Sequence, residues 1–106
     1  MFMKMYYILA SKQFLLQEEP VEEILRERLN YYKDNNLSID FWLVQNLNLL
    51  QTPELLQSAY NLVKDPAIII STNIHFIDWL KLRLQYVKTG SLNSVDPSIL
   101  KELNSK

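Results

Sequence analysis

Two arginines interrupt helical stripes that are otherwise apolar. When residues 73–88 are placed on a helical wheel at about 100° per residue, Arg83 falls inside one continuous hydrophobic arc. That arc consists of Phe76, Ile77, Trp79, Leu80, Leu84, Tyr86 and Val87. Residues 20–34 place Arg28 in a similar arc of Val21, Ile24, Leu25, Leu29, Tyr31 and Tyr32. Because a guanidinium stays charged and is rarely buried alone, each arginine needs an internal carboxylate, or its helix face contacts something else.

The composition fits one globular domain and excludes several classes of function. The chain has 106 residues, of which 48% are hydrophobic, so it can form a core of its own. Its net charge is −1, and its 11 basic residues are scattered among 12 acids, which argues against a nucleic-acid interface. The absence of cysteine excludes disulfides, thiolate metal sites and thiol catalysis. Gly90 is the single glycine, so Gly-rich phosphate-binding loops are excluded as well.

No targeting or membrane-spanning segment is expected. The residues before the first strand-like stretch are too few for a secretory or transit peptide. No apolar run approaches the about 20 residues that span a bilayer. No predicted helix is basic and amphipathic enough to lie on a bilayer alone, so membrane association would come through a partner.

The pattern of apolar residues predicts an α+β domain over residues 1–106, with a small, mostly antiparallel four-stranded sheet covered by helices. Strands are expected at 4–10, 39–45 and 67–72, and 14–17 is expected to return as a hairpin partner of the first. Both faces of 39–45 are largely apolar, which favours a central position in the sheet.

Helices are expected between these strands, where proline, glycine and capping residues mark the ends. The first runs from Pro20 to about Lys33, and a short one from Pro53 to about Val63. The long helix is capped by Thr72 or Asn73 and ends near Lys88, with Gly90 as its stop. A last helix opens at Asp96-Pro97, within a weakly ordered tail at 93–106.

Neither a catalytic site nor a metal site is indicated. His75 is the single histidine and lies at the start of a predicted helix. No pair of a general base and a nucleophile can be identified that would give it a catalytic role. One histidine leaves no cluster for zinc or non-haem iron. A group of carboxylates is interpreted as the solvent-exposed start of a helix, and its spacing is not that of a calcium-binding loop. These are Glu18, Glu19, Glu22, Glu23 and Glu27. The chain is therefore expected to be no enzyme and to hold no cofactor or metal.

Asp40 offers a structural explanation for one of the arginines. It is the charged residue on a largely apolar face of strand 39–45, where its carboxylate could pair with Arg28 or Arg83. The alternative is that Arg83, flanked by Phe76 and Trp79, forms an exposed aromatic–arginine patch. Such a patch could dock a protein or clamp the carboxylate of a flat hydrophobic ligand. Both explanations stay open on the sequence alone.

Three separated blocks carry a family resemblance. The stretches YYILASKQFLLQEEPVEEILRER, IDFWLV and STNIHFIDWLKLRLQYVKTG resemble the small accessory protein of the aerobic magnesium-protoporphyrin IX monomethyl ester cyclase, known in plants as low chlorophyll accumulation A. The resemblance covers about residues 5–92. It implies a non-catalytic accessory factor in chlorophyll biosynthesis that binds the di-iron cyclase subunit and supports its accumulation or activity. The resemblance does not decide whether other chlorophyll-biosynthesis enzymes are partners as well.

The resemblance also implies a location and a set of interaction residues. Members occur in the cyanobacterial cytoplasm or the chloroplast stroma, associated with thylakoids through partners. Family motifs include Asp40 to Trp42 and Trp79 to Arg83. We therefore predict a partner-binding surface at Asp40, Phe41, Trp79 and Arg83, and a structural or partner-binding role for Arg28 and Trp42.

Two other functions remain as alternatives. The chain could bind or hand over a tetrapyrrole, with an arginine on the propionate and the ring stacked on aromatic side chains. It could also be a purely structural subunit whose arginines are all paired internally. Removing an arginine should then cost about 3–5 kcal/mol where it leaves a buried carboxylate behind.

Overall fold

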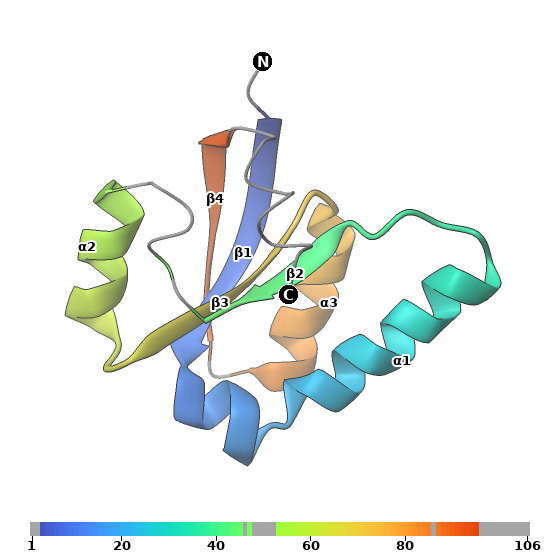
Figure 1. Cartoon of the computed structure of the whole chain (residues 1–106). Coiled ribbons are helices and arrows are strands. Elements are labelled where there is room, and N and C mark those ends of the chain that lie inside the picture. Colours follow the sequence, from blue (N-terminus) through green and yellow to red (C-terminus); the bar gives the residue numbers. More distant parts are fainter. Residues whose placement is uncertain (1–2, 46, 48–52, 86, 96–106) are drawn as a thin grey trace.

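Four antiparallel strands form the centre of the molecule (Figure 1). This computed structural model describes residues 3–45, 47, 53–85 and 87–95. The strands are β1 (Met3–Ser11), β2 (Phe41–Val44), β3 (Pro66–Ser71) and β4 (Lys88–Val95). They lie in the order β2-β3-β1-β4, and each neighbouring pair is antiparallel. The predicted α+β class and four-stranded antiparallel sheet are confirmed. The predicted central position of strand 39–45 was wrong, because β2 lies at one edge of the sheet and its apolar residues are buried by cover on both faces.

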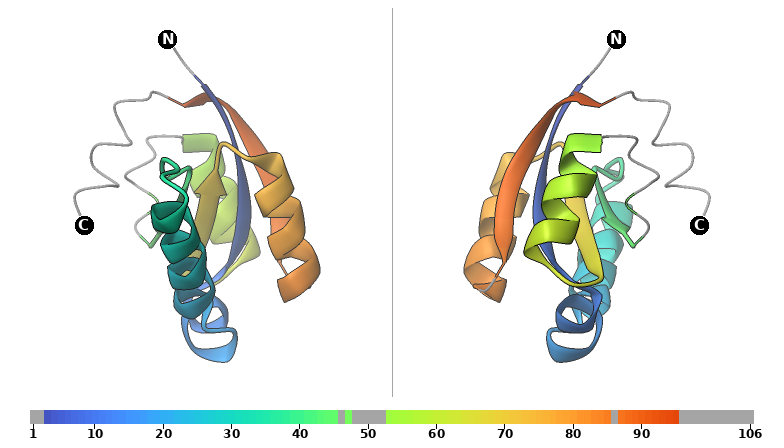
Figure 2. Two further views of the ribbon diagram at one scale, coloured as in Figure 1. Left: turned by 90° about the vertical axis from the view of Figure 1, so that its right-hand side faces the viewer. Right: turned by 90° about the vertical axis from the view of Figure 1, so that its left-hand side faces the viewer.

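The sheet is covered on both faces by helices. The short helix α2 (Pro53–Leu62) lies on one face, and α1 (Val21–Asp34) and α3 (Ile74–Leu84) lie on the other (Figures 1 and 2). This double cover explains why every residue of β3 is buried, since a β-branched run suits a strand packed on both sides. The predicted bounds of these three helices agree with the structure to within one residue at five of the six ends. The exception is the end of α3.

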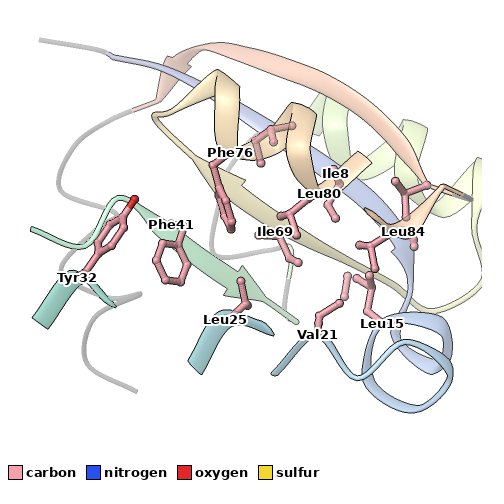
Figure 3. Close-up of a cluster of buried hydrophobic side chains, with 14 residues drawn as sticks. Ile8, Leu15, Val21, Leu25, Tyr32, Phe41, Ile69, Phe76, Leu80 and Leu84 are labelled. Atoms are coloured by element: carbon pink, nitrogen blue, oxygen red, sulfur yellow. The ribbon is translucent and has the colours of Figure 1, made fainter. Parts of the chain in front are cut away.

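Two separate hydrophobic cores result, one on each face. The α2-side core contains Met5, Leu9, Trp42, Val44, Leu47, Leu55, Ala59, Ile68, Ile70 and Leu92. The α1/α3-side core contains Ile8, Ala10, Leu15, Val21, Leu25, Tyr32, Phe41, Ala67, Ile69, Phe76, Ile77, Leu80, Leu84 and Val87 (Figure 3). Neighbouring residues of β2 belong to different cores, because successive side chains of a strand point to opposite faces.

The segment predicted as a hairpin strand at 14–17 is instead a π-helical turn, η1 (Phe14–Glu18). The Ser11 side-chain oxygen accepts a hydrogen bond from the Phe14 backbone N–H at 3.1 Å, which bends the chain out of the sheet. The Glu19 N–H then closes the turn on the Phe14 carbonyl at 2.8 Å. The turn places Leu15, which is fully buried, in the α1/α3-side core. The hairpin prediction was therefore wrong.

The fourth strand is β4, which lies where the sequence suggested the end of a helix and a tail. Gly90 is no helix stop: it lies inside β4, opposite Tyr7 of β1. A Cβ added at Gly90 would lie 2.5 Å from Tyr7 Cζ, so the absent side chain makes room for the tyrosine ring. Residues 93–95 of the expected tail belong to β4, and the expected helix at Asp96 lies outside the described residues.

Helix α3 begins as predicted and ends earlier. The Asn73 side chain accepts hydrogen bonds from the N–H groups of His75 (3.0 Å) and Phe76 (3.4 Å), which confirms Asn73 as the N-cap. The helix stops at Leu84 because Gln85 adopts a positive φ of 67°. The Lys81 ammonium secures this stop by donating to the carbonyls of Gln85 (2.9 Å) and Val87 (2.7 Å).

Among the described residues, no helix combines the length and the apolar character that crossing a bilayer requires.

Candidate interaction site

Arg28 and Asp40 are joined through a tyrosine. The Arg28 Nη2 donates to the Tyr32 hydroxyl at 3.0 Å, and that hydroxyl donates to Asp40 Oδ1 at 2.8 Å. Arg28 and Asp40 are half-buried, and Tyr32 is buried. Tyr32 reaches both partners because Arg28 lies one helical turn before it in α1, while Asp40 immediately precedes β2. The sequence suggested the carboxylate but not the hydroxyl that connects it to the arginine.

The Arg28 guanidinium also lies against two aromatic rings. Its Cζ is 4.0 Å from the ring centroid of Phe76 and 5.1 Å from that of Tyr32. A cation over an aromatic face is attracted by the negative potential of the ring. The Arg28 Nε is buried and has no hydrogen-bond partner among the described residues. The side chain is thus held by the core, with one donor left unused.

The environment keeps the Tyr32 hydroxyl protonated. Burial raises the pKa of Tyr32 above its ordinary value of 10.0, and the hydrogen bond to Asp40 raises it further. The Arg28 bond acts in the opposite direction but does not outweigh these two causes. The hydroxyl can therefore donate to the carboxylate throughout the neutral range.

A chain of five aromatic rings runs through this region and reaches the surface at both ends. Trp79 stacks on Phe76 with centroids 6.2 Å apart, Phe76 lies 5.2 Å from Phe41, Phe41 lies 5.5 Å from Tyr32, and Tyr32 lies 6.3 Å from Tyr31. Figure 3 shows the three inner rings, Tyr32, Phe41 and Phe76, side by side. The outer two are exposed, Trp79 by 48% and Tyr31 by 59%.

The two exposed rings line a groove between helices α1 and α3. One hollow of about 320 Å³ is bounded by Ile24, Glu27, Arg28, Tyr31 and Trp79. A second, of about 240 Å³, is bounded by Glu19, Pro20, Glu23, Ile24, Glu27, Trp79 and Arg83. Ile24, Glu27 and Trp79 belong to both hollows, so we treat the two together and call them the α1/α3 groove.

Arg83 differs from Arg28 in having no partner among the described residues. It is exposed, it lines the α1/α3 groove, and it makes no hydrogen bond or ion pair with any other described residue. Its position on the wheel, beside Phe76 and Trp79, leaves it at the edge of the buried face of α3. The two arginines that the sequence singles out thus have different environments.

The predicted interaction residues fall into three environments. Trp79 and Arg83 meet in the α1/α3 groove. Asp40 and Phe41 lie behind it: Asp40 bonds Tyr32, and Phe41, 6% exposed, is covered by aromatic neighbours. Trp42 is buried in the α2-side core, on the other face of the sheet. The sequence placed Ile24 and Tyr31 on the apolar face of a helix and Glu27 on a solvated face, and it did not show that these residues line a groove.

Other candidate features lie outside this groove. His75 is exposed at the start of α3. Within the described part of the chain, no three His, Cys, Asp or Glu side chains gather as a metal site would require. A larger hollow of about 610 Å³ lies between η1 and the end of α3, with Phe14, Leu62 and Lys81 in its lining, and none of the predicted site residues borders it.

Comparison with known proteins gives consistent matches over most of the chain. The family model described as Ycf54 protein matches residues 3–94. An uncharacterized ycf54 protein of Porphyra purpurea is 56% identical over 86 residues, covering 80% of this chain and 79% of the relative. A chloroplastic YCF54 protein of Arabidopsis thaliana is 37% identical over 94 residues, covering 86% of this chain and 43% of the relative. The crystal structure of the All0216 protein from Nostoc sp. PCC 7120 superposes with a TM-score of 0.81 at 46% identity, covering 97% of this chain and 95% of that one.

Proposed function

Because the chain belongs to the Ycf54 family, we propose that it is a non-catalytic accessory factor that binds the di-iron subunit of the oxygen-dependent magnesium-protoporphyrin IX monomethyl ester cyclase. In this role it supports formation of the isocyclic ring of chlorophyll, while the oxygen chemistry belongs to the partner. Relatives from a cyanobacterium, a red alga and a chloroplast agree with a phototrophic setting. Association with thylakoids would follow from the partner.

The observation that carries this proposal is that Arg83, which has no partner in the described part of the chain, lines the groove with the exposed Trp79. Tryptophan and arginine dominate the energetics of protein interfaces, because both bury large areas and make directed polar contacts. Neither side chain is needed to close the core, since Arg83 has no partner among the described residues and Trp79 is half exposed. The inner residues Asp40 and Phe41 support this surface from behind through Tyr32 and Phe76.

The first test is Arg83→Ala with two measurements. A thermal melt should be nearly unchanged, with stability within about 0.5 kcal/mol of the wild type, because an exposed, unpaired side chain is removed. Recovery of the di-iron subunit by the tagged protein from a phototroph lysate should fall sharply. The matched control is Arg26→Ala, which removes an exposed arginine of α1 outside the groove and should leave recovery intact. Equal recovery by both variants and the wild type would remove Arg83 from the interface.

A second function is favoured by one specific observation: Arg28 lines the same hollow as the exposed rings of Trp79 and Tyr31. A tetrapyrrole propionate could accept from a guanidinium there while its ring stacks on the exposed aromatic side chains. Titration with a magnesium porphyrin distinguishes this tetrapyrrole-binding function. A shift of the Soret band with quenching of tryptophan fluorescence at micromolar ligand would support it, and an unchanged spectrum would exclude it.

A further inference from the structure

The end of the groove at the start of α1 carries more carboxylates than cations. Glu23 and Glu27 are exposed and lie one helical turn apart, about 6 Å along the axis, and Glu19 precedes them by the same spacing in sequence. None of the three forms an ion pair with a described basic residue. Like charges at this spacing repel each other in an isolated helix. At this end of the groove three carboxylates face one guanidinium, that of Arg83.

The surface between these charges is apolar. Ile24 is half-buried, and Trp79 and Tyr31 present large exposed rings in the same hollow. Exposed aromatic side chains lining a concave surface are typical of sites that receive apolar side chains of a partner. The groove therefore combines an apolar floor with an acidic edge on α1 and two cations: Arg28 of α1, which bonds Tyr32, and the exposed Arg83 of α3.

We propose that the α1/α3 groove receives a basic amphipathic helix of the partner protein. Its apolar side chains pack on Trp79, Ile24 and Tyr31. Lysines or arginines spaced by four residues on one edge pair with Glu23 and Glu27, which have the same spacing. A carboxylate on the opposite edge pairs with Arg83. This inference rests on the proposed accessory function and specifies the chemistry of the element that the partner supplies.

The charge arrangement disfavours other occupants. Nucleic acid and anionic lipid headgroups carry the same sign as the three carboxylates and would be repelled at this end of the groove. A second copy of the chain remains a physical alternative, because its own helices carry both signs of charge. The experiments below separate that alternative from a helix of the partner.

The first experiment reverses charge on the acidic edge. We compare the wild type with Glu23→Lys/Glu27→Lys and with the matched control Glu18→Lys/Glu22→Lys. The control has the same spacing and net charge but neither residue borders the groove. Affinity for the purified di-iron subunit is measured at several NaCl concentrations. The groove variant should bind at least about tenfold more weakly and with a smaller salt dependence, and the control should stay close to the wild type.

The second experiment uses only the wild-type protein and so does not depend on the folding of a variant. A zero-length carbodiimide couples carboxylates to lysine amines that they contact. Mass spectrometry of the coupled complex should find Glu23 or Glu27 joined to a lysine in a helical, amphipathic segment of the di-iron subunit. Links to another copy of this chain, or links from the partner only to other surfaces, would overturn the inference.

The outcomes also separate this inference from the proposed function. If the wild type fails to bind the di-iron subunit at all, the proposed function fails and the inference falls with it. If the wild type binds and Glu23→Lys/Glu27→Lys binds equally well at every salt concentration, the function stands and the acidic edge is excluded from the interface.

Discussion

The two faces of the sheet are built differently, although one strand serves both. On the α2 side, Trp42 packs among aliphatic side chains such as Ile68 and Ile70, and the core is closed. On the α1/α3 side, its neighbour Phe41 belongs to a chain of aromatic rings that encloses the Arg28 guanidinium and ends at the surface. The first face is lined mainly by aliphatic side chains among the described residues, whereas the second contains a hydrogen-bonded arginine, tyrosine and aspartate.

This difference indicates a division of roles. A buried polar network is costly unless its members are satisfied, and it rigidifies the structure when they are. The bonds from Arg28 through Tyr32 to Asp40 hold the start of β2 against α1, while Phe76 links this network to Trp79. Both faces therefore supply stability, and the α1/α3 side in addition positions the exposed groove residues. The following predictions test that division.

The largest effect is expected for Phe76→Ala. Phe76 is buried and contacts Phe41, Trp79 and the Arg28 guanidinium, so its removal leaves a cavity and withdraws support from the groove. The free energy of unfolding should fall by about 3–5 kcal/mol, as measured by urea denaturation. Binding of the di-iron subunit per folded molecule should also weaken, because Trp79 loses the ring on which it stacks.

The matched change on the other face is Ile70→Ala. Ile70 is fully buried in the α2-side core, so this variant should lose about 2–5 kcal/mol by the same cavity mechanism. Binding per folded molecule, measured at low temperature, should stay at the wild-type value. If Ile70→Ala weakens binding as strongly as Phe76→Ala, the proposed division between the two faces is wrong.

Local patterns were sufficient to predict most of the fold. A β-branched run between turn residues identified β3, and proline and asparagine identified the starts of α2 and α3. The fourth strand was missed because Lys88–Val95 has no regular alternation of apolar residues. It is held by pairing with β1, from which it is distant in sequence. The early end of α3 depends on the positive φ of Gln85 and the hydrogen bonds of Lys81, which helical periodicity does not reveal.

The site was likewise predictable only in part, because sequence patterns describe single elements and not the contacts between them. The helical wheel identified Arg28 and Arg83 as anomalies, and Asp40 as a candidate partner. It could not assign the carboxylate, because the separation between Tyr32 and Asp40 is set by the turn that joins α1 to β2. It also placed Ile24 and Tyr31 on the apolar face of a helix without showing that a groove opens beside them. Contacts between elements, rather than patterns within them, decide these positions.

An intermediate effect is expected for Arg28→Ala. The change removes the bond to Tyr32 and the contact with Phe76, but Asp40 is only half-buried and keeps its bond from the tyrosine. The loss in unfolding free energy should be about 1–3 kcal/mol, smaller than for a fully buried ion pair. Thermal melts should therefore separate Arg28→Ala from Arg83→Ala. Equal melting temperatures for the two variants would contradict the different environments assigned to these arginines.

An effect no larger than that of Arg28→Ala is expected at neutral pH for Tyr32→Phe, which removes the hydroxyl and keeps the ring. The cost should be about 1–3 kcal/mol, because the lost hydrogen bonds go to charged partners. The pH dependence is more informative. Because the pKa of Tyr32 is raised in the folded state, the unfolded chain loses this proton first, near its ordinary value of 10.0. The contribution of Tyr32 is therefore complete below pH 10 and declines as the pH rises above it. Burial also raises the pKa of Tyr7, so the wild type should lose stability in alkali through both tyrosines.

Urea denaturation between pH 8 and alkaline pH checks this prediction. The free energy of unfolding should decline less steeply with pH for Tyr32→Phe than for the wild type, with Tyr31→Phe, on the exposed ring, as the control. Parallel declines for all three proteins would show that the hydroxyl between Arg28 and Asp40 does not titrate as part of the folded network.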